Sequence, residues 1–366
     1  MKLDIVVFGL SITSSWGNGH AVTYRALLKA LAARGHQITF FERDVPWYRE
    51  NRDLPHADYC RIEIYRELRD LPRFVSQVTN ADLVIIGSYV PDGAIVGDWI
   101  TSISRGVTAF YDIDTPVTLA GLAQGRTEYI TPSLIPRFDL YLSFTGGPTL
   151  EQLEQQYGSP CARPLYCSAD TELHVPLALP NDFALGYLGT YSKDRQPALE
   201  RLLVEPARAL KNERFVVAGA QYPKSVRFPK NVTRLEHAPP AEHPVFYARQ
   251  RYTLNVTRAD MVAAGYSPSV RLFEAAACGV PVISDRWAGL ETFFTPGEEI
   301  LIADSAADVL SILNELPESR RRAVADAARR RFMHEHSPAQ RARDLQNYYA
   351  AIIEAKPEHV LAEGVA

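Results

Sequence analysis

The chain has 366 residues, more than one ordinary hydrophobic core accommodates and about right for two domains. Apolar residues make up 46% and charged residues 22%, as in water-soluble globular proteins. The formal net charge is −4, which disfavours nucleic acid as a partner because nucleic-acid-binding surfaces are usually rich in positive charge. The chain has no apolar run of about 18 residues, the length that predicts a membrane span.

The N-terminal stretch MKLDIVVFGL has a short apolar run preceded by an acidic residue. It predicts a buried parallel strand and not a secretion signal. The four cysteines (Cys60, Cys161, Cys167 and Cys278) show no CxxC spacing and no neighbouring histidine cluster. We therefore expect reduced thiols and a cytoplasmic protein.

Strands and helices alternate through the first half of the chain. Strands are expected at 5–10, 37–42, 82–87, 107–112, 139–144 and 162–167. Helices are expected at 20–34, 68–78, 92–104 and from about 148. The stretch FERDVPWYRENRDLP after residue 40 has no clear pattern. Repeated βα units predict a parallel sheet with helices on both faces.

The alternation stops at SADTELHVPLALPND, which reads as a connector, and then restarts. Strands are expected at 183–189, 214–219, 231–237, 251–257, 280–285 and 299–304, with helices at 195–211, 269–278 and over most of the last fifty residues. We therefore predict an α/β protein of two Rossmann-like, doubly wound domains, 1–170 and 171–340. A final helix within 341–366 is expected to pack back on the first domain, followed by a tail.

Open parallel sheets bind ligands at the carboxyl ends of their strands. Two such domains facing a central cleft would suit a two-substrate transfer, with one substrate held by each domain. In the first domain, Gly17 and Gly19 lie between the first strand and the first helix, where glycines let a ligand approach the backbone. The full GxGxxG pattern is absent, so a nicotinamide site is disfavoured. We expect this loop to hold an acceptor, with His20 either catalytic or a polar cap.

The stretch GYSPSVRLFEAAACGVPVISD carries the strongest functional pattern. Ser267 and Ser269 flank a proline and predict a capped helix start, where free N–H groups bind anions. Arg271 can grip a phosphate through two nitrogens, and Glu274, one turn on, can accept hydrogen bonds from two ribose hydroxyls. The alanines that follow allow close packing on a sheet. This combination predicts a nucleotide site; the alternative is a capped core helix with a surface Arg–Glu pair.

SPSVRLFEAAACGVPVISDRWAGLETFFTPGEEILIA resembles the C-terminal domain of bacterial CgeB-like glycosyltransferases of GT-B architecture. WGNGHAVTYRALLKALAARGH, FERD and YDIDTP resemble their N-terminal half. The resemblance implies a nucleotide-sugar donor held mainly by the second domain and an acceptor held by the first. Many retaining GT-B enzymes carry two glutamates eight residues apart. Here the second is Glu274 and the first position is Tyr266, so the stereochemistry is not carried over.

Position alone suggests further donor contacts after strands of the second domain. Those expected to bind the nucleotide are Gly189, Lys193, Arg195, Tyr222, His237, Thr257 and Arg258. A basic residue after the first strand would stabilise the charge that a departing nucleoside diphosphate gains. Surface lysine and arginine without such a role are the alternative.

Asp112 and Asp114 in YDIDTP follow a strand of the first domain. Asp-x-Asp can bind a metal, but here it lies in the domain opposite the donor, so we expect no metal and no cofactor beyond the nucleotide-sugar co-substrate. The first choice of general base is Asp112, followed by His20 and Asp114. Asp114 could instead cap a helix near Pro116.

The sequence therefore predicts a metal-independent hexosyltransferase acting on a glycan, lipid-linked or protein hydroxyl, with no nucleic-acid partner. The alternatives are a nucleotide-sugar 2-epimerase and a non-catalytic nucleotide-sugar or glycan-binding protein. Arginine triplets at 320–322 and 329–331 predict a solvated helix face, with peripheral membrane contact as the alternative. The nucleoside, sugar, acceptor, stereochemistry and oligomeric state are left open.

Overall fold

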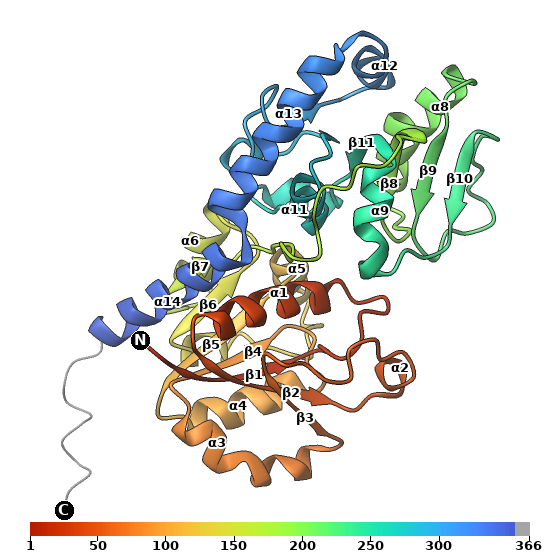
Figure 1. Ribbon diagram of the computed structural model, residues 1–366. Coiled ribbons are helices and arrows are strands. Elements are labelled where there is room, and N and C mark those ends of the chain that lie inside the picture. Colours follow the sequence, from red (N-terminus) through yellow and green to blue (C-terminus); the bar gives the residue numbers. More distant parts are fainter. Residues whose placement is uncertain (356–366) are drawn as a thin grey trace, which may run out of the picture. The chain divides into compact units, whose positions relative to one another are not determined.

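The computed structural model describes residues 1–355, which divide into two compact units (Figure 1). Unit 1 contains residues 1–165 and the chain from residue 339, and unit 2 is Tyr166–Pro338. The sequence analysis placed the same two divisions at 170 and 340, a few residues later. Each unit is built on one fully parallel sheet, the arrangement expected of repeated βα connections.

Unit 1 has a seven-stranded sheet in the order β3-β2-β1-β4-β5-β6-β7. Its strands are β1 Asp4–Gly9, β2 Gln37–Arg43, β3 Arg61–Tyr65, β4 Leu83–Gly87, β5 Val107–Asp112, β6 Leu140–Ser143 and β7 Ala162–Pro164. From β1 the chain first adds β2 and β3 on one side and then β4 to β7 on the other side, so the strand order changes direction between β1 and β4. Doubly wound sheets bind ligands at this place. The central strands β1, β4, β5 and β6 are buried along almost their whole length, as strands covered on both faces should be.

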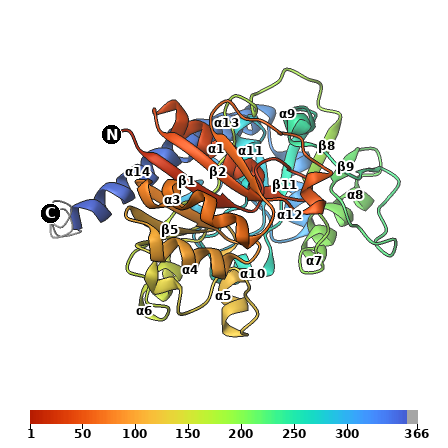
Figure 2. The ribbon, with the colours of Figure 1, turned by 90° about the horizontal axis from the view of Figure 1, so that it is seen from below.

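Helices cover both faces of this sheet. They are α1 Gly19–Ala33, α2 Pro46–Arg49, η1 Leu68–Phe74, α3 Val75–Asn80, α4 Gly93–Ile103, α5 Thr115–Ala123, η2 Ile135–Arg137, α6 Pro148–Gln155 and α14 Pro338–Ala355. α1 lies on one face, and α3 and α4 lie on the other, in front of the strands in Figure 2. Beneath α3 and α4 the core is aromatic: the rings of Phe8 and Phe41 stack with centroids 4.6 Å apart.

α14 belongs to unit 1 although it ends the described chain. The Tyr348 hydroxyl donates to the Pro164 carbonyl at 3.0 Å, and Gln346 Nε2 lies 2.7 Å from His36 Nε2. Leu345 on the same helix is 1% exposed. α14 therefore completes a unit whose other elements lie more than 170 residues earlier in the sequence.

Unit 2 has a six-stranded sheet in the order β10-β9-β8-β11-β12-β13. Its strands are β8 Phe183–Leu188, β9 Phe215–Ala218, β10 Val232–Leu235, β11 Gln250–Asn255, β12 Val282–Ser284 and β13 Leu301–Ile302. Its helices are α7 Gln196–Leu199, η3 Glu200–Val204, α8 Glu205–Ala209, η4 Pro240–Glu242, α9 His243–Ala248, α10 Ala259–Ala264, α11 Val270–Ala277, η5 Leu290–Thr292, α12 Ala306–Glu315, α13 Glu318–Arg331 and η6 Phe332–His336. The strand order again changes direction beside the first strand of the unit, between β8 and β11.

The arginine triplets of α13 lie against other groups of unit 2. Arg321 and Arg322 both pair with Glu318, and Arg320 donates to the Gly297 carbonyl. Arg329 donates to the Ala277 carbonyl. These contacts favour the solvated, packed helix face over a membrane-binding one. Within residues 1–355, no helix is both long and apolar enough to cross a membrane, and none of the four cysteines forms a disulfide.

Candidate functional site

The carboxyl edge of the unit 2 sheet brings several predicted residues together. Gly189 follows β8 and Gly219 follows β9, and their backbones touch. Gly219 has a φ of +146°, and a Cβ there would lie 2.0 Å from the Gly189 carbonyl oxygen. Only glycine fits this position. The chain thus brings two strand ends into contact at the edge where Rossmann-like sheets bind ligands.

Arg271, in the first turn of α11, is fixed against this edge. Its Nε donates to the Leu188 carbonyl, and its Nη1 donates to Asn255 Oδ1 at 2.8 Å. The guanidinium lies over the Tyr187 ring, 4.8 Å from the centroid. A Cβ on Gly189 would lie 3.0 Å from Arg271 Nη2, so this nitrogen faces the loop after β8. The side chain is only 7% exposed and is therefore held in one orientation.

Two further arginines add positive charge to the same region. Burial lowers the pKa of Arg195, and the nearby charges of Arg271 and Arg258 lower it further. Arg195 Nη2 donates to the Thr190 carbonyl, whereas its Nε is buried and has no hydrogen-bond partner among residues 1–355. Three like charges that repel one another favour a bound anion.

The start of α11 differs from the capped helix that the sequence suggested. The helix begins at Val270, and Ser269 is the residue before it, but the Ser269 hydroxyl donates to Asn255 Oδ1 at 2.8 Å and does not cap the helix. Ser267 contacts Met261 Sδ at 2.8 Å. The two serines therefore position neighbouring side chains, and the first N–H groups of α11 have no side-chain cap.

Glu274 lies on α11 one turn after Arg271, but its surroundings are not those of a surface ribose contact. It is 2% exposed, Tyr247 donates to its Oε2 at 2.9 Å, and His243 Nδ1 lies 3.2 Å from its Oε1. His174 Nε2 is 3.6 Å from the same Oε1. Burial raises the pKa of Glu274, but His243 and the other neighbours outweigh it and bring it to about 2. Both oxygens already have neighbours within unit 2, so the structure argues against the expected ribose contact.

The remaining donor-side candidates occupy the same edge with different exposure. Thr257 is buried and donates its hydroxyl to Asp285 at 2.8 Å, which fixes the end of β11 to the end of β12. The Tyr222 hydroxyl donates to the Gly189 carbonyl at 3.2 Å. Lys193 and His237 are exposed on loops that follow β8 and β10.

In unit 1 the structure argues against Asp112 as the first choice of base. Its carboxylate is 0% exposed and accepts hydrogen bonds from Tyr141 Oη at 2.6 Å, Thr118 Oγ1 at 2.8 Å and the Asp114 N–H at 3.2 Å. Burial raises the pKa of Asp112 to about 6. A carboxylate enclosed by three donors has no free face for an acceptor hydroxyl, so Asp112 acts as a positioning group for Asp114.

Asp114 and His20 are the partly exposed members of this group, with side chains 23% and 14% exposed. Asp114 is the residue before α5, but its side chain does not cap the helix as expected; its Oδ2 accepts from Tyr89 Oη at 3.2 Å and lies 3.9 Å from His20 Nε2. Asn18 caps the start of α1, because its side chain accepts a hydrogen bond from the His20 N–H. His20 is therefore held beside a carboxylate at the carboxyl ends of β1, β4 and β5, while its ring stays available.

The loop carrying Gly17 and Gly19 is exposed, with a φ of +61° at Gly17. The preceding residues are fixed by Glu42, whose carboxylate accepts from the N–H groups of Ile12 and Thr13. Because Glu42 at the end of β2 is fully engaged and 0% exposed, it is not available to bind a ribose as in dinucleotide-binding proteins.

Residues 195–347 match the family model described as "Glycosyl transferase-like". Solved structures resemble the whole chain: a sucrose-phosphate synthase from Thermosynechococcus elongatus aligns with a TM-score of 0.71 at 17% identity, covering 96% of this chain and 100% of that one. The fold is GT-B. This confirms the predicted architecture of two Rossmann-like domains.

Two further GT-B structures carry ligands. Anabaena HepE in complex with UDP and glucose aligns with a TM-score of 0.71 at 12% identity, covering 95% of this chain and all of that one. An α-glucosyltransferase in complex with UDP-glucose and DNA containing an abasic site aligns with a TM-score of 0.72 at 12% identity, covering 96% and 100%. No curated protein matches the chain. The CgeB-like subfamily stays a prediction.

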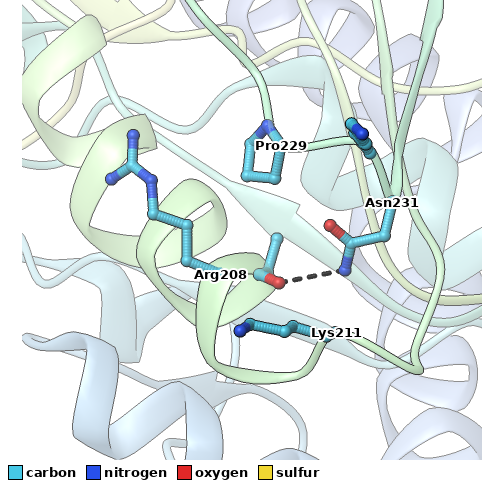
Figure 3. Close-up of a pocket in the computed structure, with 6 residues that line it drawn as sticks. Arg208, Lys211, Pro229 and Asn231 are labelled. Atoms are coloured by element: carbon cyan, nitrogen blue, oxygen red, sulfur yellow. Dashed lines mark hydrogen bonds between the residues drawn. The ribbon is translucent and has the colours of Figure 1, made fainter.

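A pocket of about 530 Å³ lies elsewhere on this GT-B fold, between α8 and the loop before β10 (Figure 3). Arg208, Lys211 and Lys230 line it. The loop before β10 is at the amino edge of the parallel sheet, opposite the ends of β8 and β11. Asn231 in this pocket donates its amide to three backbone carbonyls and so holds the loop. The pocket is not at the ligand-binding edge.

Several residues of this GT-B site were not singled out in the sequence. Asn255 accepts hydrogen bonds from both Ser269 and Arg271, and Tyr187 supports the guanidinium. The signal for Asn255 was its place at the end of a predicted strand. His174 and His243 carried no signal, because they lie far from Glu274 in the sequence.

Proposed function

We propose that the protein is a glycosyltransferase that moves a sugar from a nucleoside diphosphate sugar to a hydroxyl group. The observation that carries this is the arginine cluster of Arg271, Arg195 and Arg258 beside the uncapped start of α11. Such an arrangement offers charge and N–H donors to a diphosphate. All three arginines lie within the residues that match the glycosyl transferase-like family model.

In the proposed reaction the bond between the anomeric carbon and the diphosphate oxygen breaks, and its electron pair stays on that oxygen. The acceptor oxygen bonds to the anomeric carbon and gives up its proton. The arginines favour this step because the departing diphosphate gains negative charge as the bond breaks. We propose that these cations, with exposed Lys193, make a divalent ion at the diphosphate unnecessary.

We assign the acceptor to unit 1. His20 Nε2 is proposed to take the acceptor proton, and Asp114, 3.9 Å away, to stabilise the imidazolium that forms. The exposed ring of Trp47, 58% accessible, offers a face on which a sugar ring can pack. We propose a hexosyl transfer to a glycan, lipid-linked or protein hydroxyl. The net charge of −4 favours these acceptors over nucleic acid.

The donor site is tested by Arg271→Ala. We expect calorimetric affinity for the preferred donor, found by a thermal-shift screen of UDP-, GDP- and dTDP-sugars, to fall roughly 30-fold or more, because at least one charged hydrogen-bond pair of about 2 kcal/mol or more is lost. Arg249→Ala is the matched control. Its guanidinium lies just before β11, at the amino edge, and pairs with Asp182.

Because Arg271 is buried, Arg258→Ala provides a second variant whose side chain is more exposed. Unchanged donor affinity in both variants would count against the site. Product analysis with and without acceptors then identifies the reaction. A glycosylated acceptor or donor hydrolysis supports the transferase, an epimerised sugar nucleotide supports an epimerase, and binding without turnover supports a binding protein.

A further inference from the structure

His174, His243 and Glu274 form a buried group in unit 2 that the proposed sugar transfer does not use. His174 lies in the connector before β8, His243 begins α9, and Glu274 is on α11. The three are 1%, 9% and 2% exposed. One nitrogen of each histidine and one oxygen of the glutamate lie within 4.8 Å of one another. Three segments of the chain thus bring their polar atoms to one point inside the unit.

The outer nitrogens of both histidines face backbone carbonyls. His174 Nδ1 lies 3.1 Å from the Asp170 carbonyl oxygen, and His243 Nε2 lies 3.1 Å from the Ala238 carbonyl oxygen. A carbonyl can only accept, so each of these nitrogens carries the proton and donates it. In a neutral imidazole the other nitrogen then presents a lone pair. Both inner nitrogens are therefore acceptors in the neutral histidines.

These two inner nitrogens converge on an oxygen that is also an acceptor. His243 Nδ1 is 3.2 Å and His174 Nε2 is 3.6 Å from Glu274 Oε1. His174 Nε2 has no hydrogen-bond partner among residues 1–355. Three lone pairs facing one another in a buried place are unfavourable unless a proton or a metal cation lies among them.

We propose that His174, His243 and Glu274 bind one divalent transition-metal ion of the zinc class. Neighbouring ligand atoms in a tetrahedral zinc site are about 3.3 Å apart, and the two nitrogen–oxygen separations lie on either side of this value. Two imidazoles in a set of three donors favour zinc over magnesium or calcium, which prefer oxygen. The carbonyls behind each histidine, and Tyr247 on Glu274 Oε2, are the outer contacts that orient metal ligands.

This ion would join the connector, α9 and α11 on the Glu274 side of the helix, whereas Arg271 lies against the ends of β8 and β11. The proposal does not depend on the sugar transfer. The rival explanation is an imidazolium: burial alone would lower the pKa of His243, but the Glu274 charge outweighs it and raises it. A protonated His243 would donate to Glu274 without any metal.

The test uses the full chain, with any polyhistidine tag removed, stripped with a chelator and titrated with Zn²⁺ and Co²⁺. We expect one ion per chain and the visible absorption of four-coordinate Co²⁺. His174→Ala should weaken Zn²⁺ binding at least 100-fold in a competition assay with a zinc-sensitive dye. His334→Ala, whose side chain is 85% exposed, is the control and should bind like the unmodified chain.

The metal proposal can be tested on the unmodified chain alone, even if His174→Ala does not fold. NMR of its histidine nitrogens in the presence of one equivalent of Zn²⁺ distinguishes a metal-bound Nδ1 of His243 from a protonated one. A doubly protonated His243, or Zn²⁺ binding weaker than that of the exposed histidines, overturns the proposal. Equal affinity of folded His174→Ala and the unmodified chain overturns it as well.

Discussion

Asp112 illustrates how burial decides which of two neighbouring carboxylates can take part in chemistry. Asp112 is the last residue of β5 and Asp114 follows the strand. Asp112 points into unit 1 and accepts from Tyr141 and Thr118, whereas Asp114 points to Tyr89 and His20. One hydrogen bond links them, from the Asp114 N–H to Asp112 Oδ1. Asp112 thus fixes the backbone that presents Asp114.

The raised pKa of Asp112 has a consequence for stability. Its pKa is about 6 in the folded protein, against an ordinary value of 3.8. Between these pH values the folded chain retains a proton that the unfolded chain has lost, so stability falls as pH rises through this window. A shift of this size corresponds to roughly 2–3 kcal/mol. Asparagine in its place cannot lose a proton.

We therefore expect Asp112→Asn to fold and to retain turnover within about tenfold. Its free energy of unfolding should decrease less between pH 4 and pH 6.5 than that of the unmodified chain. Denaturant unfolding at several pH values, compared with the unmodified chain, measures the second effect. His20→Ala is the comparison for turnover and should lose about 100-fold or more, the usual contribution of a general base. Loss of turnover in Asp112→Asn with normal donor binding would restore Asp112 as the base.

At the scale of elements, the loops after β8 and β9 lie so close together that position 219 accepts only glycine. Gly219 and Gly17 both have positive φ, but only Gly219 has a neighbour in the space of a Cβ, the Gly189 carbonyl oxygen at 2.0 Å. Gly17 has no atom within 4 Å of that position. An alanine at Gly17 would therefore introduce backbone strain alone, whereas an alanine at Gly219 would introduce both strain and a steric overlap.

Gly219→Ala should destabilise the protein by roughly 3 kcal/mol, the sum of left-handed strain and a displaced backbone. Gly17→Ala should cost about 1 kcal/mol, because only the strain remains. Unfolding in denaturant measures both. The displaced Gly189 loop should also weaken donor binding in the first variant. Equal destabilisation by the two alanines would contradict the close contact in the structure.

Where the sequence did not predict an element correctly, each case has its own physical cause. β3 pairs only with β2, at the sheet edge, and its sequence RIEIY alternates charged and apolar residues after a stretch rich in prolines and polar groups. α9 is only six residues long and has a proline after its first residue, too short for a helical period to show. The helix expected over 195–211 is interrupted by a π turn, η3, just before Pro206, which has no N–H to continue the ladder.

The sequence pattern was sufficient to predict the parts of the candidate site whose residues lie on one element. It was not sufficient where the fold brings together residues from several elements. The spacing of Arg271 and Glu274 on one helix was visible in the sequence. The contact of Glu274 with His174 and His243 was not, because these residues are 100 and 31 positions away. The same holds for Asn255, whose two donors come from a different element.

On the scale of the whole molecule, the chain returns to unit 1 for its final helix. Leu345 is buried in α14, and its neighbour Gln346 contacts His36 after α1. Unit 1 therefore lacks part of its packing until residues 339–355 have been added. Unit 2, Tyr166–Pro338, is complete before that point.

Leu345→Ala should accordingly destabilise unit 1 by about 2–5 kcal/mol, the range for a buried leucine truncated to alanine, and leave unit 2 unaffected. Hydrogen exchange followed by mass spectrometry distinguishes the two, since amides of β1, β2 and α1 should exchange faster while those of β8 and β11 keep their protection. Ile353→Ala, on the same helix but 43% exposed, is the matched control and should change neither. Faster exchange spread evenly over both sheets would mean that the units do not unfold separately and that α14 serves the whole chain.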